Sequence, residues 1–117
     1  MDISHLHLHV RDRVLSEAFY RRWFGLATKR SDDEITFMFG DRDFLLALME
    51  DPARGSMPPW FHFGIRLDSA GDVRDMLGAM QVAGVPIVKP LYEDEAFASF
   101  RCADPDANAI EVYWDGS

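Results

Sequence analysis

Apolar and polar positions alternate from the start of the chain. In residues 3–10 the three histidines His5, His7 and His9 alternate with leucine and valine, which predicts a strand with one imidazole face and one apolar face. Residues 13–24 then follow a helical period, and Gly25 is placed to end the helix. The apolar positions expected to form the buried stripe of this helix are Leu15, Ala18, Phe19 and Trp23.

Three short apolar runs follow the first helix. They span residues 26–29, 35–39 and 44–49, and the Asp-Asp and Gly-Asp pairs between them predict the turns of an antiparallel meander. Residues 51–59 are rich in Pro and Gly and are expected to form a linker. The first half of the chain is thus predicted to run strand, helix, three strands.

The second half repeats this order. A strand is expected at 60–67 and a helix at 69–83, with Ser69 as N-cap and Gly84 as the residue that ends it. Strands at 87–92, 97–102 and 109–114 complete the copy. The buried stripe of the second helix is predicted at Val73, Met76, Leu77 and Met80.

The repeat also places a histidine at the head of each copy, because His62 follows His5 by 57 residues. Such a repeat predicts two copies of one module, module 1 at about 1–50 and module 2 at about 60–117, within one domain of 117 residues. A pseudo-twofold axis would bring the two histidines together, so a shared site is the first functional hypothesis.

Strand parity extends this hypothesis to a carboxylate. In residues 60–67 the side chains of His62, Gly64 and Arg66 share the face opposite the apolar one. In residues 109–114 the corresponding polar face carries Glu111 and Tyr113. If the sheets curl around these faces, His5, His62 and Glu111 line one concavity, and two imidazoles with one carboxylate suit a divalent transition metal with open coordination positions.

Composition limits the other possibilities. The net charge is −8, which disfavours nucleic acid as a partner, and no stretch approaches the ~20 apolar residues of a membrane span. No signal-peptide pattern opens the sequence, so a cytoplasmic protein is expected. The single cysteine, Cys102, lies in an apolar run and is expected to be a buried, unreactive thiol.

Four segments together resemble the vicinal oxygen chelate superfamily, which includes glyoxalase I, bleomycin and fosfomycin resistance proteins, methylmalonyl-CoA epimerase and extradiol dioxygenases. The segments are HLHLHVRD at 5–12, AFYRRWFGL at 18–26, HFGIRL at 62–67 and DPDANAIEV at 104–112. The resemblance implies an α+β fold in which paired βαβββ modules form a cup-shaped, partly open β-barrel with helices outside, usually in a homodimer. It also implies that His5, His62 and Glu111 occupy three metal-ligand positions.

The fourth position of that family is expected at Ala47, which cannot bind a metal, and Glu50 should face the other side of its strand. This argues against glyoxalase and epimerase chemistry, because those relatives use the fourth residue as ligand or base. Extradiol dioxygenases bind Fe(II) through two His and one Glu, so dioxygenase-like chemistry on a small substrate is favoured. The metal is expected to be Fe²⁺, Mn²⁺, Zn²⁺ or Ni²⁺.

Further residues are predicted around this centre. The candidate acid–base groups are His7 and Tyr113, and the candidate substrate-binding residues are His9, Arg66, Tyr92, Ser99 and Arg101. Two alternatives stay open: a metal-free protein of the bleomycin-resistance type that sequesters an aromatic cationic drug, and a relative whose cup serves only as a scaffold. The histidine and glutamate set favours the enzyme, because a sequestering cup has no physical need for it.

Overall fold

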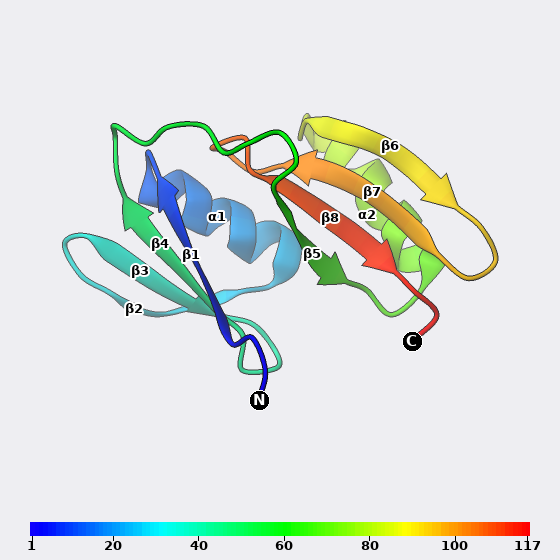
Figure 1. Ribbon diagram of the computed structural model, residues 1–117, viewed down its shortest axis with the longest axis horizontal. Coiled ribbons are helices and arrows are strands. Elements are labelled where there is room, and N and C mark those ends of the chain that lie inside the picture. Colours follow the sequence, from blue (N-terminus) through cyan, green and yellow to red (C-terminus); the bar gives the residue numbers. More distant parts are fainter. The chain divides into compact units, whose positions relative to one another are not determined.

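The structure is a computed structural model that describes residues 1–117, and it divides into two compact units, Met1–Ser56 and Met57–Ser117. We call them unit 1 and unit 2. Each runs strand, helix, three strands, so the predicted α+β class and the paired βαβββ modules are confirmed (Figure 1). Unit 1 contains β1 (His5–Val10), α1 (Arg13–Phe24), β2 (Ala27–Ser31), β3 (Ile35–Phe39) and β4 (Leu45–Glu50). Unit 2 contains β5 (His62–Arg66), α2 (Ala70–Ala83), β6 (Ile87–Glu93), β7 (Ala98–Ala103) and β8 (Ala109–Trp114).

Both sheets have the same topology. The strand order is β1-β4-β3-β2 in unit 1 and β5-β8-β7-β6 in unit 2, and the first and last strands of each module pair in parallel while the others pair antiparallel. The first strand of each module therefore lies beside the last. This brings the two ends of each module, which are distant in sequence, next to each other.

The ends of α1 are set by two residues that the sequence favours at these places. The Asp12 carboxylate accepts hydrogen bonds from the backbone N–H groups of Val14 (2.9 Å) and Leu15 (3.2 Å), and Gly25 adopts a left-handed conformation with φ 65°. Arg13 then donates to the carbonyl oxygens of Asp32 (2.7 Å) and Asp33 (2.9 Å). These two bonds fix the helix to the turn between β2 and β3.

The predicted buried stripe of α1 is wrong at Leu15 and Ala18, while Phe19 and Trp23 are partly buried. Leu15 is 59% exposed and Ala18 is also exposed, whereas the buried residues are Ser16 and Tyr20. The small Ser16 side chain occupies little space against the sheet, and the large Tyr20 side chain fills the space beside it. The fully buried residues, Ser16 and Tyr20, thus each lie one position after a residue that the sequence predicted to be buried.

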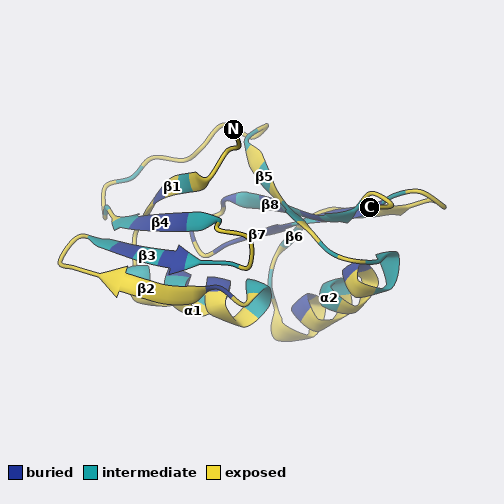
Figure 2. Cartoon of the chain, turned by 90° about the horizontal axis from the view of Figure 1, so that it is seen from below, coloured by how far each residue is buried: buried dark blue, intermediate teal, exposed yellow.

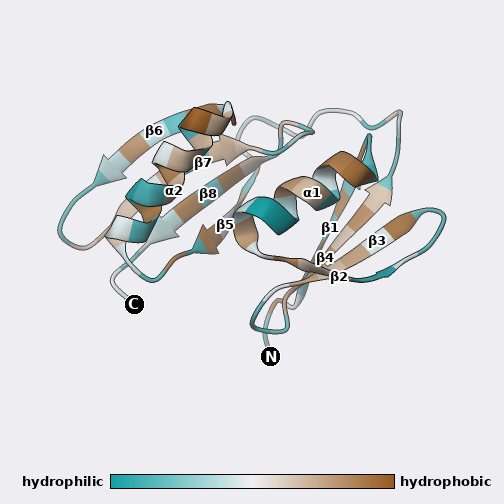
Figure 3. Cartoon of the chain, turned by 180° about the vertical axis from the view of Figure 1, so that it is seen from behind, coloured by the Kyte–Doolittle hydropathy of each residue, from teal (hydrophilic) through white to brown (hydrophobic).

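The predicted stripe of α2 is confirmed. Val73 and Met80 are fully buried and Met76 and Leu77 are partly buried against β7 and β8. Ser69 caps the helix by accepting from the backbone N–H of Asp72 (3.0 Å), and Gly84 ends it with φ 81°. Figure 2 shows buried and exposed positions along α2, and Figure 3 shows both hydrophobic and hydrophilic ones.

Alternation along the strands separates a core face from a polar face, as predicted. In β1 the residues Leu8 and Val10 are buried while the three histidines are exposed, and in β8 the residues Ile110 and Val112 are fully buried. Cys102 is buried among them, and this burial raises the pKa of its thiol to about 12. Neither helix is long and apolar enough to span a bilayer.

Candidate functional site

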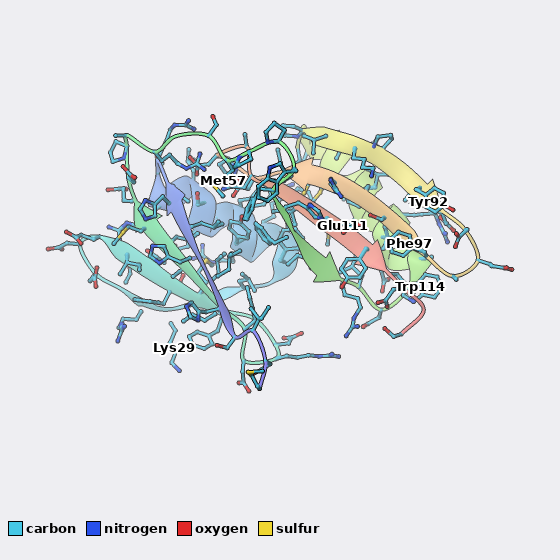
Figure 4. All side chains as sticks on the ribbon, viewed as in Figure 1. Lys29, Met57, Tyr92, Phe97, Glu111 and Trp114 are labelled. Atoms are coloured by element: carbon cyan, nitrogen blue, oxygen red, sulfur yellow. The ribbon has the colours of Figure 1, made fainter.

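The polar face of unit 2 gathers the candidate residues on three adjacent strands. Glu111 on β8 lies between Gly64 of β5 and Arg101 of β7. Residue Tyr113, two positions along the same strand, lies between Arg66 and Ser99. Strand pairing alone therefore brings together residues that are up to 49 positions apart in sequence, and Figure 4 shows Glu111 on the sheet that carries them.

His62 and Glu111 form the centre of this group. Their Nε2 and Oε1 atoms are 3.7 Å apart, and the two side chains are 33% and 23% exposed. The other ring nitrogen of His62, Nδ1, lies 3.2 Å from the carbonyl oxygen of Trp60. A carbonyl oxygen only accepts hydrogen bonds, so Nδ1 carries the proton of the neutral ring and Nε2 is the nitrogen that can accept a hydrogen bond or bind a metal.

The two oxygens of Glu111 have different roles. Oε2 accepts a hydrogen bond of 2.6 Å from the hydroxyl of Ser99, which is buried, while Oε1 faces His62. The serine thereby holds the carboxylate in one orientation. One oxygen remains directed at the imidazole.

Arg101 completes the group. Its Nη2 donates to Nε2 of His62 over 3.4 Å, while its Nε is buried and has no hydrogen-bond partner. A buried donor without a partner is costly. The guanidinium, with Nη2 at His62, is the positive charge nearest to the His62 and Glu111 pair.

The turn between β7 and β8 fixes the register of this group. Asp104, which is buried, accepts hydrogen bonds through Oδ1 from the backbone N–H groups of Asp106 (2.9 Å) and Asn108 (2.8 Å). The side-chain amide of Asn108 donates to Oδ2 of the same carboxylate (3.0 Å). This tight turn sets which residues of β7 and β8 are opposite each other.

Sequence reasoning missed the part played by Gly64. A Cβ atom at this position would lie 2.9 Å from Cε1 of Tyr113, so the tyrosine ring lies over the glycine. The pattern offered one indication, because a glycine interrupts the polar face between His62 and Arg66. The ring that covers it belongs to another strand and could not be inferred locally.

Two predicted substrate-binding residues have partners of their own. Arg66 contacts the hydroxyl of Ser117 (3.2 Å) and the carboxylate of Asp115 (3.9 Å). Tyr92 is exposed and donates its hydroxyl proton to Asp94 over 2.8 Å, and this bond to the carboxylate raises the pKa of the phenol. Arg66 and Tyr92 are thus occupied by structural contacts within unit 2.

The histidines of β1 share the exposed face of unit 1. His7 and His9 have ring centroids 5.2 Å apart, and Nδ1 of His9 lies 2.9 Å from the Asp51 carboxylate. His5 pairs with Leu45 of β4, at the start of the strand. Glu50 lies within 3.9 Å of Arg13, on the helix side of the sheet, as its parity predicted.

The two modules can be compared residue by residue through their registers. His7 pairs with Ala47, which pairs with Phe37, and Gly64 pairs with Glu111, which pairs with Arg101. In this comparison His5 corresponds to His62 and Ala47 corresponds to Glu111. Ala47 thus stands in unit 1 at the position where unit 2 carries its carboxylate.

The residues of unit 2 fit two ligands of a metal ion. Ligand atoms about 2.1 Å from a common ion lie at most about 4 Å apart, and the separation of 3.7 Å between His62 and Glu111 is within this limit. Neutral imidazole and carboxylate are also the donor types that suit Fe, Mn, Zn and Ni. No group of three or more His, Cys, Asp or Glu side chains within either unit is placed to hold a metal.

Comparison with known proteins gives one family and many structural neighbours. A family model described as the glyoxalase/bleomycin resistance protein/dioxygenase superfamily matches residues 2–112. A possible glyoxalase from Bacillus cereus is 27% identical with a TM-score of 0.84, and the match covers 96% of this chain and 97% of that one. A comparison with curated proteins finds no match.

Two further neighbours share the fold at lower identity. A lactoylglutathione lyase from Agrobacterium tumefaciens is 21% identical with a TM-score of 0.77, covering 97% of this chain and 92% of that one. A fosfomycin resistance protein from Listeria monocytogenes is 20% identical with a TM-score of 0.83, covering 97% and 93%.

Proposed function

Because the chain belongs to the glyoxalase/bleomycin resistance protein/dioxygenase superfamily, we propose that it is a metal-dependent enzyme that acts on a small molecule. The observation that carries the proposal is the 3.7 Å separation between His62 Nε2 and Glu111 Oε1, two atoms of metal-ligand type. His62 and Glu111 are the proposed ligands in unit 2. The third ligand, predicted from the sequence, is His5.

The chemistry proposed is of the dioxygenase type. An Fe²⁺, Mn²⁺, Zn²⁺ or Ni²⁺ ion, when bound, supplies a Lewis acid for two neighbouring oxygens of the substrate. The absence of a carboxylate at Ala47, the position that corresponds to Glu111, argues against reactions that need a fourth acidic residue. Dioxygenase-like chemistry is therefore favoured over glyoxalase-like chemistry.

The residues of the chain then have distinct tasks. Ser99 holds Glu111 in place through the 2.6 Å hydrogen bond, and the carbonyl of Trp60 keeps the proton of His62 on Nδ1. Arg101, whose guanidinium lies beside His62, binds an acceptor atom of the substrate. Tyr113 and His7 are the proposed groups that accept or release a proton.

Family membership also supports a homodimer, because members of this superfamily are typically dimeric proteins acting on small molecules. The cytoplasm is the place expected from the sequence. We include both features in the proposal. Size-exclusion chromatography with light scattering on the purified chain would measure the mass in solution. A mass of one chain, about 13.4 kDa, would contradict the dimer.

The test of the metal proposal is elemental mass spectrometry of protein purified without an affinity tag or chelator. We expect one transition metal per chain in the wild type and at least a tenfold loss in His5→Ala, His62→Ala and Glu111→Gln. His9→Ala is the matched control, since it also removes an exposed imidazole of β1 but one that is paired with Asp51. It should retain the metal.

The proposal fails if the wild type, after reconstitution with Fe²⁺, Mn²⁺, Zn²⁺ or Ni²⁺, holds no more metal than His62→Ala. The metal-free alternative, a protein that sequesters a cationic drug, would then be tested by titration with such drugs. The net charge of −8 is the observation that favours this alternative.

A further inference from the structure

Two consecutive cations lie on the same face of β2. The register between β2 and β3 shifts between Thr28 and Arg30, so that a β-bulge interrupts the strand there. On a regular strand Lys29 and Arg30 would point to opposite faces, whereas a bulge turns two neighbouring side chains to the same side. The bulge thus doubles the positive charge at one place on the sheet.

Both cations cover aromatic rings of the neighbouring strand. Lys29 Nζ lies 4.6 Å from the ring centroid of Phe39, and the guanidinium carbon of Arg30 lies 4.6 Å from that of Phe37. Phe37 and Phe39 share one face of β3 because they are two residues apart. Figure 4 shows Lys29 beside the sheet of unit 1.

These four residues and Leu45 line a pocket of 330 Å³. Its volume is within the range of small-molecule sites, and an apolar floor with a few charged groups is the usual composition of such sites. Leu45 pairs with His5 on one side and with Phe39 on the other. The pocket therefore begins one strand away from the histidine that we propose as a metal ligand.

Neither cation of this pocket forms an ion pair. No carboxylate lies within 4.0 Å of Lys29 or Arg30, and the nearest charge effect is the contribution of Arg30 to the lowered pKa of Asp32. Two cations without an ion-pair partner beside aromatic rings attract an anion and repel a cation. This argues against a cationic ligand in unit 1.

We propose that this pocket binds an aromatic carboxylate, with its ring against Phe37 and Phe39 and its carboxylate on Lys29 and Arg30. As an assignment of substrate class, the inference rests on the proposed function, because it makes the bound anion the substrate of the metal centre. The binding itself depends only on residues of unit 1. It can therefore be tested separately from the metal.

The test is calorimetric titration with 2-naphthoate and with its neutral analogue 2-naphthylmethanol at constant ionic strength. The wild type should bind naphthoate more tightly than the alcohol. Lys29→Gln and Arg30→Gln should each weaken naphthoate binding about tenfold, since each removes one charge-assisted hydrogen bond, and leave the alcohol unchanged. Phe37→Leu should weaken both compounds.

Arg22→Gln is the matched control. Arg22 is also an arginine of unit 1 whose guanidinium lies 4.6 Å from an aromatic ring, that of Trp23, but it lies on α1 and not in the pocket. It removes the same charge and should change naphthoate binding less than twofold. Equal affinities for naphthoate and the alcohol, or equal losses in Arg30→Gln and Arg22→Gln, would overturn the proposal.

Titrating metal-stripped and metal-loaded protein separates this inference from the proposed function. If naphthoate binds both forms and Arg30→Gln weakens it, the anion pocket is supported whatever the metal analysis gives. If metal is bound as proposed but naphthoate binding is insensitive to Lys29→Gln and Arg30→Gln, the substrate class is wrong and the metal centre stands.

Discussion

Ala107 adopts φ 64° in the turn that connects β7 to β8. This left-handed conformation brings the Cβ of an L-residue close to its own backbone, whereas glycine adopts it without that penalty. The turn also fixes the register of Ser99, Arg101 and Glu111. The strained backbone at Ala107 is therefore part of the turn that positions the candidate site.

We expect Ala107→Gly to stabilise the protein by about 1 kcal/mol, which is the left-handed penalty of alanine less the extra flexibility of glycine in the unfolded chain. Urea denaturation would measure this difference. The control is Ala83→Gly, in the last turn of α2, where the same substitution should destabilise instead. A loss of stability in Ala107→Gly would contradict the strain argument.

For single residues, the sequence predicted the strand face on which a side chain lies better than the side chains that it contacts. The alternation of polar and apolar residues placed His62 and Glu111 on one face, and pairing of β5 with β8 brings them to 3.7 Å. The Tyr113 ring over Gly64 was missed because it depends on packing between strands. The Lys29 and Arg30 pair was missed because a bulge breaks the alternation on which the reasoning relied.

Among the elements, helix α1 shows how a cap stabilises a helix whose buried face is small. Only Ser16 and Tyr20 are buried along its length, so burial contributes less to its stability than the number of apolar residues suggests. Its N-terminus is held by the two hydrogen bonds that the Asp12 carboxylate accepts. This cap therefore adds to the stability that the packing of Tyr20 gives α1.

We expect Asp12→Ala to lower the free energy of unfolding by about 1 kcal/mol, because the first backbone N–H groups of the helix lose their acceptor. Asp12→Asn is the matched variant and should lose much less, since its side-chain oxygen still accepts these bonds. Thermal and urea denaturation would measure both. Equal losses in the two variants would show that the charge of Asp12 matters and its cap does not.

Element boundaries were predicted closely wherever a specific residue marks them. The predicted helix ends at Gly25, Ser69 and Gly84 are confirmed, because capping is a local interaction, whereas the cap at Asp12 was not predicted. The buried side of α1 was predicted only in part, because the choice between two adjacent stripes is made by the sheet on which the helix packs. The buried stripe of α2 was predicted correctly, since it has only one continuous apolar side.

For the whole molecule, the pH dependence of stability follows from carboxylates that are hydrogen bonded only in the folded state. The pKa of Glu17 is lowered, first by the Thr28 hydroxyl and then by Arg21, and that of Asp51 is lowered by the hydrogen bond from His9. Backbone N–H groups lower the pKa of Asp32 and Asp94. In each case the unfolded state binds protons more readily than the folded state.

The stabilisation from these groups is thus complete above their ordinary pKa values of 3.8 and 4.5 and is lost as the pH falls through the lower folded values. We expect the free energy of unfolding to fall below about pH 4.5. Thr28→Val removes the main hydrogen bond to Glu17 and should make this fall shallower. Urea denaturation from pH 7 to 3 measures both, and parallel curves for the two proteins would contradict the assignment.

For the whole molecule, the prediction of two like modules is confirmed, because the same order of strand, helix and three strands is visible twice in the sequence. The correspondence between Ala47 and Glu111 was also expected from register, and pairing of β1 with β4 and of β5 with β8 supports it. The pocket of unit 1 was not foreseen. It depends on a bulge and on ring contacts that no periodicity reports.

The two modules have equal registers, so the same fold carries two different sets of side chains within a single chain. Where unit 2 has Glu111 and Arg101, unit 1 has Ala47 and Phe37, so the same places on the sheet are polar in one copy and apolar in the other. In our proposals, unit 2 supplies two metal ligands, and unit 1 supplies the third ligand and the pocket for an aromatic anion. Each module is thereby a template for redesigning the other, because a residue in one has a defined counterpart in the other.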